Sequence, residues 1–168
     1  LLKHRAIGGK VEWHLIGHLQ TNKVKDAVRI FSLIHSVDSL KLAQAIDKEA
    51  AKLGKRQSIL IQINISGEES KFGISPGETI DFLKEASLYP DISIEGLMTI
   101  VPEVRDPETV RPYFRALREL LAKTSPIVKN LSNGTRYSTL SMGMTNDFET
   151  AIEEGSNMVR IGRAIFER

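Results

Sequence analysis

The chain has 168 residues, 41% hydrophobic and 26% charged, with a formal net charge of +2, which indicates one globular domain and excludes a disordered or fibrous chain. Cysteine is absent, which excludes disulfides and thiolate metal sites, and we expect a cytoplasmic protein. Dispersed charges, few aromatic residues and the lack of an apolar run of about 20 residues argue against a nucleic-acid surface, a signal peptide and a membrane span.

Short apolar runs alternate with amphipathic segments along the whole chain. In the first part, the apolar runs predict strands over residues 11–17, 31–37 and 58–65. The amphipathic segments predict helices over residues 20–29 and 38–53, and Gly54 supplies the stop of the second.

The same alternation continues to the end of the chain. Strands are predicted over residues 92–100, 139–144 and 158–162. Helices are predicted over residues 76–88, 107–123 and 146–154, followed by a short one over 163–166. Pro76 suits a first helical turn, Asn146 and Glu149 have the spacing of a capping box, and Gly155 should end that helix.

Six strands with five helices between them imply parallel βαβ crossovers, and therefore an α/β fold. Two architectures remain open, a doubly wound sheet, which six units suit, and a closed barrel, which needs eight. Residues 1–6 look like the tail of a helix, so we expect this chain to be a fragment of a longer protein.

Ligands of such sheets bind at the carboxyl ends of the strands. The fifth strand ends in SMGM at 141–144, which includes Ser141, Met142 and Gly143, and the sixth ends at Gly162 and is followed by Arg163. A hydroxyl, two glycines that permit close backbone approach and amides at a helix start are suited to a phosphate. The plain alternative is that these glycines only end their strands.

Arg160 lies inside the sixth predicted strand. If Val159 and Ile161 face the helices, the period of two sends Arg160 to the opposite face. A buried guanidinium needs several acceptors, and these could be a carboxylate such as Asp147 or Glu149, or an anionic or nitrogen-containing ligand.

The remaining candidates are weaker. His14 and His18 have the spacing of a helical metal pair, but they straddle a strand end and a turn, so no metal site is expected. Asn64 stands at a strand end, and Lys71 lies in a loop, where it could reach a bound anion or be a solvated charge.

With these residues in view, the chain resembles the pyridoxal phosphate homeostasis proteins. The segments that carry the resemblance run in order from near the start to the end of the chain. They are WHLIG at 13–17, LQTNK at 19–23, HSVDS at 35–39, QINIS at 62–66, SKFG at 70–73, EGLMTI at 95–100, LSMGMT at 140–145 and VRIGRAIF at 159–166.

The resemblance implies a (β/α)8 TIM barrel like the N-terminal domain of alanine racemase, as one domain over residues 1–168 with about six of the eight units present. It implies binding of pyridoxal 5′-phosphate (PLP) without established catalytic activity. The implied role is vitamin B6 and amino-acid homeostasis, by buffering the cofactor or delivering it to PLP-dependent apo-enzymes, with a monomeric state for a complete chain.

The resemblance also implies roles for individual residues. Ser141 and the backbone around Gly162 and Arg163 would hold the phosphate, while Arg160 would face the pyridine nitrogen. An arginine cannot give up its proton, so the ring would stay a poor electron sink. The remaining expected cofactor-binding residues are His14, Asn64, Lys71, Met142 and Gly143.

Two features depart from the family pattern. The lysine that forms the Schiff base with PLP lies on the family's first strand, followed by a Gly-Glu-Asn motif on the second, and neither occurs in this chain. We therefore expect the anchor lysine on missing first strands, since Lys23 or Lys71 could replace it only by accident. Glu167 stands where the family usually has glycine.

Two alternatives to a cofactor carrier remain. A racemase-type enzyme needs bases on both faces of the cofactor, usually that lysine and a tyrosine from a second domain. Tyr89, Tyr113 and Tyr137 all fall in predicted helices or loops, which favours the carrier. The other alternative is a truncated chain with impaired cofactor binding.

Overall fold

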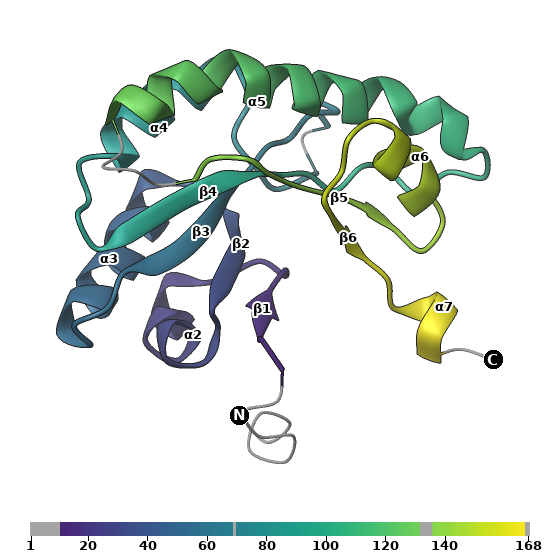
Figure 1. Cartoon of the computed structure of the whole chain (residues 1–168). Coiled ribbons are helices and arrows are strands. Elements are labelled where there is room, and N and C mark those ends of the chain that lie inside the picture. The colour runs from purple at the N-terminus through teal and green to yellow at the C-terminus, as the bar shows by residue number, and fades with distance from the viewer. Residues whose placement is uncertain (1–10, 69, 132–135, 167–168) are drawn as a thin grey trace.

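The structure, a computed structural model, describes residues 11–68, 70–131 and 136–166. The predicted helix tail at residues 1–6 and the departure at Glu167 lie outside these residues. Within them, all six predicted strands occur and form one parallel sheet in the order β1-β2-β3-β4-β5-β6 (Figure 1). Each strand pairs with the next along the chain, whereas the strand order of a doubly wound sheet reverses. The architecture is therefore that of a barrel wall.

The strands are generally shorter than the sequence predicts. They are β1 (His14–Leu15), β2 (Leu33–Val37), β3 (Gln57–Gln62), β4 (Ile92–Met98), β5 (Thr139–Met144) and β6 (Met158–Arg160). Only β5 has the predicted bounds. β3 ends early because the backbone of Asn64 donates to Ile74, which in turn donates to Gln62, so the chain pairs with its own loop there.

A helix follows each of the first five strands in the described residues. These helices are α2 (Val24–Ile30), α3 (Leu40–Lys52), α4 (Thr79–Ala86), α5 (Arg111–Leu131) and α6 (Phe148–Glu153), and α7 (Arg163–Phe166) follows β6. The hydroxyl of Ser39 caps α3 by accepting from the amide of Leu42, and Gly54, at φ +60°, lies just beyond its end as predicted. No helix of the described residues is long and apolar enough to cross a bilayer.

Two predictions about the helices are wrong. α5 continues from Lys123 to Leu131 through Pro126, because one side of it stays buried at helical spacing as far as Val128, and this packing outweighs the hydrogen bond lost at proline. The expected capping box of α6 does not form. Its N-cap is Asp147, whose carboxylate accepts from the amide of Met144.

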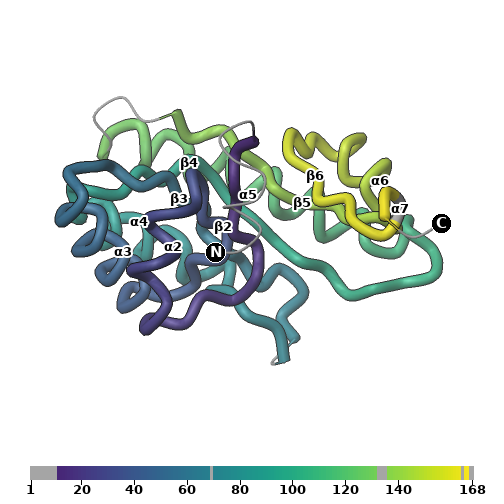
Figure 2. Tube along the Cα trace, turned by 90° about the horizontal axis from the view of Figure 1, so that it is seen from below, coloured from purple at the N-terminus to yellow at the C-terminus, as the bar shows by residue number. Residues whose placement is uncertain are grey.

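The two faces of the sheet differ in what covers them. Helices α2 to α6 lie along the outer face, and their apolar side chains form the main core with alternate strand residues such as Ile34, Ile61 and Leu97 (Figures 1 and 2). Strand residues of the opposite parity point to the inner face. There Leu33, Leu60 and Met98 form a second buried cluster, against which Ile100 and Met158 pack.

Candidate functional site

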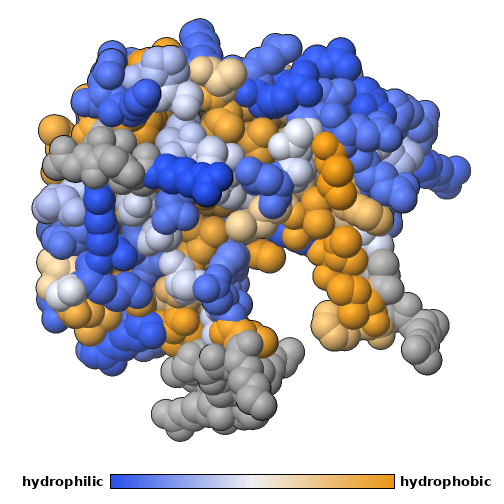
Figure 3. All heavy atoms as spheres, viewed as in Figure 1, coloured by the Kyte–Doolittle hydropathy of each residue, from blue (hydrophilic) through white to orange (hydrophobic). Residues whose placement is uncertain are grey.

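A layer of polar side chains lies on the inner face, at the carboxyl ends of the strands. Three of its members come two residues after an apolar residue of the inner cluster on the same strand, and the other two pair in register with residues of that cluster, so all five share its face. They are His14 on β1, His35 on β2, Gln62 on β3, Ser141 on β5 and Arg160 on β6. All except His14 are buried, and Figure 3 shows the surface hollowed below the arch of the sheet.

Arg160 is the charged centre of this layer. It is 8% exposed, and it donates from Nη1 to the hydroxyl of Ser141 and from Nη2 to the carbonyl of Thr99, both at 2.7 Å. Its Nε is buried without a partner, and no ion pair among the described residues involves it. Burial lowers the pKa of Arg160 to about 10, against a smaller opposing effect of Asp147, so the guanidinium remains charged at neutral pH.

This geometry bears on both predicted carboxylate partners of Arg160. Asp147 contributes only a longer-range attraction, since its carboxylate binds the Met144 amide, and Glu149 is exposed. A buried cation that has only neutral acceptors and one unpaired N–H can donate a hydrogen bond to a ligand. The arrangement therefore fits a ring nitrogen or an anion.

Ser141 connects Arg160 to two histidines. Its Oγ is 2.9 Å from Nδ1 of His35, whose Nε2 is 3.2 Å from Nδ1 of His14. Burial, followed by the charges of His14 and Arg160, lowers the pKa of His35 to about 3, so this imidazole is neutral. The hydroxyl of Ser141, predicted to hold a phosphate, is thus occupied by Arg160 and His35.

The predicted phosphate residues after β6 lie beside the end of β5. The amide of Gly162 donates to the hydroxyl of Thr145 at 3.4 Å, and the carbonyl of Gly162 accepts from the amides of Ile165 and Phe166 in α7. The guanidinium of Arg163 donates to Glu103 at 2.6 Å, and Asn146 donates to the same carboxylate at 3.1 Å. Thr145, Gly162 and Arg163 are therefore brought together, with the side chain of Arg163 held by Glu103.

Two more residues predicted to bind the cofactor, Met142 and Gly143, lie at the end of the fifth strand. Their side-chain positions face the helices and contribute to packing. Met142 is fully buried in the helix-side core. Gly143 has φ +92°, and a Cβ there would lie 2.6 Å from the Cβ of Ala151, so glycine permits the close approach of α6. Neither side-chain position lies in the polar layer.

Asn64 and Lys71 belong to one loop beyond β3. The Asn64 carboxamide accepts from the amide of Gly67 and donates to the carbonyl of Glu68, while the amide of Lys71 donates to that same carbonyl. Gln62 ties this loop to the polar layer, because its Nε2 donates to the carbonyl of Phe72 at 3.1 Å. Asn64 thus shapes the loop that carries Lys71.

His14 and His18 do not form a metal pair. His14 contacts His35, whereas His18 stacks on Phe72 with ring centroids 4.1 Å apart and lies 3.7 Å from the carboxylate of Asp38. No group of three potential ligands that could hold a metal ion occurs within the described ranges.

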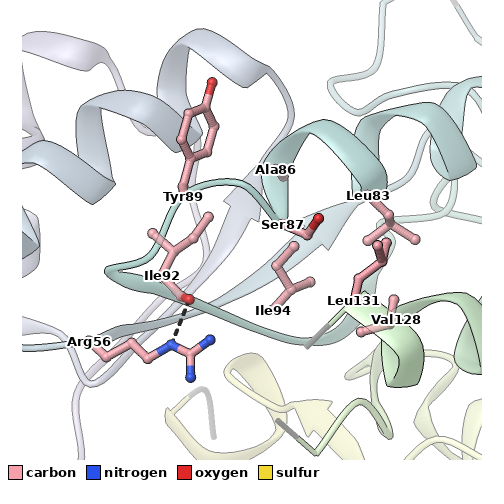
Figure 4. A pocket seen from close by; sticks show the side chains of 9 residues that line it. All are labelled: Arg56, Leu83, Ala86, Ser87, Tyr89, Ile92, Ile94, Val128 and Leu131. Atoms are coloured by element: carbon pink, nitrogen blue, oxygen red, sulfur yellow. Dashed lines mark hydrogen bonds between the residues drawn. The ribbon is translucent and has the colours of Figure 1, made fainter. Parts of the chain in front are cut away.

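A small cavity on the outer side of the sheet is unrelated to this layer. It lies between α4, α5 and the amino-terminal half of β4, where Arg56 donates to the carbonyl of Ile92 (Figure 4). Its volume is about 30 Å³, room for a water or two, and far below the roughly 300 Å³ of small-molecule pockets. We therefore assign it no ligand.

Sequence reasoning missed four participants of the site. His35 shares the parity of Leu33 on β2, a signal that could have placed it on the inner face. Gln62 likewise shares the parity of Leu60 on β3, and Thr145 is the first residue after the predicted fifth strand. The carbonyl of Thr99, by contrast, could not have been chosen from sequence, because every residue has a carbonyl.

Comparison with known proteins places this fold and site in a family. The profile described as "Alanine racemase, N-terminal domain" matches residues 1–167. The chain is 45% identical to the pyridoxal phosphate homeostasis protein of Aquifex aeolicus over 156 residues, which cover 93% of the chain and 66% of that relative. The chain thus spans slightly less than two thirds of this relative's length.

Solved structures agree with the profile. PipY of Synechococcus elongatus, with PLP bound, aligns with a TM-score of 0.85 and 30% identity, over 98% of this chain and 74% of PipY. Alanine racemase of Clostridium difficile aligns with a TM-score of 0.76 at 18% identity, over 99% of this chain and 42% of the racemase, which shows a shared fold alone. The chain therefore belongs to the family of pyridoxal phosphate homeostasis proteins, built on the fold of the alanine racemase N-terminal domain.

Proposed function

We propose that the inner polar layer binds PLP and that the protein buffers this cofactor or delivers it to PLP-dependent apo-enzymes. The observation that carries the proposal is the state of Arg160, a buried cation without a carboxylate and with an unpaired Nε. The family relationship supplies the identity of the ligand, since its relatives are named for PLP homeostasis and PipY binds PLP.

Arg160 would donate a hydrogen bond to the pyridine nitrogen. PLP supplies an aldehyde and an electron-withdrawing ring, and the strength of that ring as an electron sink depends on protonation of its nitrogen. An arginine donates a hydrogen bond without giving up its proton, so the nitrogen stays unprotonated. This contact is suited to holding the cofactor and supports a carrier over a catalyst.

The phosphate would lie at the opposite end of the ring. Thr145 and the backbone amides of Gly162 and Arg163, which meet where β5 and β6 end, would hold it together with the backbone of Met142 and Gly143. Ser141 would act through Arg160, which it orients. His14 would border the ring pocket, and the loop set by Asn64 would bring Lys71 to its rim.

The positions of the tyrosines also favour a carrier, although the fold itself is shared with racemases. Tyr89 and Tyr113 pack against the helix-side core, and Tyr137 is buried with its hydroxyl 3.0 Å from that of Thr124. All three are described residues, and these contacts place them on the outer side of the sheet. None of them can supply a base to a ligand on the inner face.

Isothermal titration calorimetry with PLP and with pyridoxine 5′-phosphate tests the proposal. Pyridoxine 5′-phosphate has the ring nitrogen and phosphate of PLP but no aldehyde, so its affinity reports the non-covalent site without any lysine reaction. We expect Arg160→Ala to weaken binding of both ligands by about 10- to 150-fold, the equivalent of about 1.5–3 kcal/mol for a charge-assisted hydrogen bond. Borohydride reduction and peptide mass spectrometry would locate any lysine that reacts with PLP.

Arg29→Ala is the matched control. Arg29 is an exposed arginine on α2, so its removal changes the net charge equally without touching the inner face. Its affinity for both ligands should equal that of the unaltered chain. Equal affinities of Arg160→Ala and Arg29→Ala would place the cofactor site elsewhere.

A further inference from the structure

The hydrogen bonds from Arg160 to His14 have a defined direction. An arginine only donates, so the hydroxyl oxygen of Ser141 must accept from Nη1 of Arg160. The proton of that hydroxyl then needs an acceptor of its own. Among the described residues, Nδ1 of His35, 2.9 Å away, is the acceptor in contact with it.

This requirement fixes the tautomer of His35. If Nδ1 accepts from Ser141, the ring proton lies on Nε2, from which it is donated to Nδ1 of His14 at 3.2 Å. The other tautomer, like the protonated ring, would point an N–H at Ser141 and leave the buried hydroxyl proton without an acceptor. The burial of His35 and the charge of Arg160 favour the neutral ring independently.

We propose that His35 is the positioning residue of Arg160. Two contacts hold the guanidinium plane, the Thr99 carbonyl at Nη2 and the Ser141 hydroxyl at Nη1. The first is backbone, and Thr99 is itself fixed by a bond from its hydroxyl to the carbonyl of Ile63. The second depends on a rotatable hydroxyl, and His35 sets its rotation. With both in place, the guanidinium and its unpaired Nε–H are held in one orientation on the inner face.

A pair of variants separates positioning from packing. His35→Asn keeps a carbonyl oxygen near the place of Nδ1, whereas His35→Leu has nearly the same size and shape as asparagine but no acceptor. The ligand part of this test rests on the proposed function, because it uses pyridoxine 5′-phosphate. We expect His35→Asn to bind within about threefold of the unaltered chain and His35→Leu about tenfold more weakly, as for one lost hydrogen bond.

A double-variant cycle shows whether His35 acts through Ser141. Ser141→Ala should lose about as much affinity as His35→Leu, and the two changes together should lose no more than Ser141→Ala alone. Equal losses in His35→Asn and His35→Leu, or additive losses in the double variant, would overturn the proposal, because a residue that only packs behaves in that way.

The ligand-free protein provides a readout independent of PLP. Long-range ¹H–¹⁵N correlation spectra assign the ring proton of His35, and we expect it on Nε2 with Nδ1 bare; a proton on Nδ1 would overturn the positioning role. If the unaltered chain binds neither PLP nor pyridoxine 5′-phosphate, the proposed function fails. The tautomer then decides the positioning of Arg160 by itself.

Discussion

Two buried charged side chains in this molecule differ in whether they have a counter-ion. On the helix side, Glu154 has a side chain that is 5% exposed and is surrounded by three arginines of α5, with the guanidiniums of Arg115, Arg118 and Arg111 at 2.9, 3.0 and 3.3 Å. On the inner face, Arg160 is buried to a similar degree and contacts only neutral acceptors.

The difference separates a structural charge from one that is available to a ligand. The hydrogen bond of Arg115, followed by that of Arg111, lowers the pKa of Glu154 and outweighs the opposing effect of burial. Its interactions connect α6 to α5 and leave nothing for a ligand to satisfy. Arg160 remains incompletely bonded because its layer supplies a hydroxyl and a carbonyl where α5 supplies counter-ions.

The largest change in stability should come from protonation of His35 at low pH, which would place a second positive charge close to Arg160. Because the pKa of His35 falls from 6.5 to about 3 on folding, only the unfolded chain takes up this proton between those values. The stability that depends on neutral His35 is complete above pH 6.5 and is lost as the pH falls. We expect a loss of about 2 kcal/mol between pH 6.5 and 5, at about 1.4 kcal/mol per pH unit.

Urea unfolding at several pH values measures this loss. His35→Asn cannot take up the proton, so its stability should decline less over the same range, and the difference between the two curves isolates His35 from the other histidines. Parallel curves for the two proteins would show that His35 does not stay neutral in the folded state.

An intermediate change in stability is expected from replacing Glu154, the buried charge that is paired with three arginines. Glu154→Gln should lower Tm by a few degrees at pH 7, because three partly exposed arginines lose their shared anion but can still turn to water. Since the pKa of Glu154 is below its ordinary value of 4.5, its contribution is present above pH 4.5 and is lost at lower pH. The gap in Tm between the two proteins should therefore close in acid.

Glu149→Gln provides the control for this comparison. Glu149 lies in α6, the helix that Glu154 caps at its C-terminus, but it is exposed, so its replacement should leave Tm nearly unchanged in thermal scans at both pH values. A decrease equal to that of Glu154→Gln would mean that net charge, and not the arginine cluster, sets the effect.

The smallest change in stability is expected from replacing Arg160, the buried charge without a counter-ion. Arg160→Met releases a buried cation without stranding a counter-ion, and this gain offsets the two hydrogen bonds lost at Ser141 and Thr99. Denaturant unfolding should give a change within about 1 kcal/mol, together with the loss of pyridoxine 5′-phosphate binding. A loss of several kcal/mol would show that Arg160 is as structural as Glu154.

Much of the architecture could be predicted from local pattern. The β-branched run of β3 and the alternation of strands with helices define the six units, and Ser39 and Gly54 mark the bounds of α3 because capping depends on neighbouring residues. The end of α5 could not be predicted from Pro126, since the packing that carries the helix past it is tertiary. The pairing of Asn64 with Ile74, which shortens β3, is equally non-local.

The candidate site was predictable to a similar extent. The inward direction of Arg160 follows from the period of its strand, and the structure places it there. Its partners do not follow, because Thr99, Ser141 and His35 come from three other strands or strand ends and meet only through the register of the sheet. Whether Ser141 contacts a phosphate or Arg160 is likewise a question of geometry.

The simple order of the strands has a consequence for how the chain reaches this structure. Every strand pairs with the strand that precedes it in the sequence. Each pairing therefore closes only the loop that contains the helix between those two strands. The entropic cost of loop closure rises with loop length, and folding slows when contacts join distant segments. This topology therefore allows assembly by stepwise addition, in which Arg160, on the last strand of the sheet, joins a hydroxyl and a carbonyl that earlier steps have already placed.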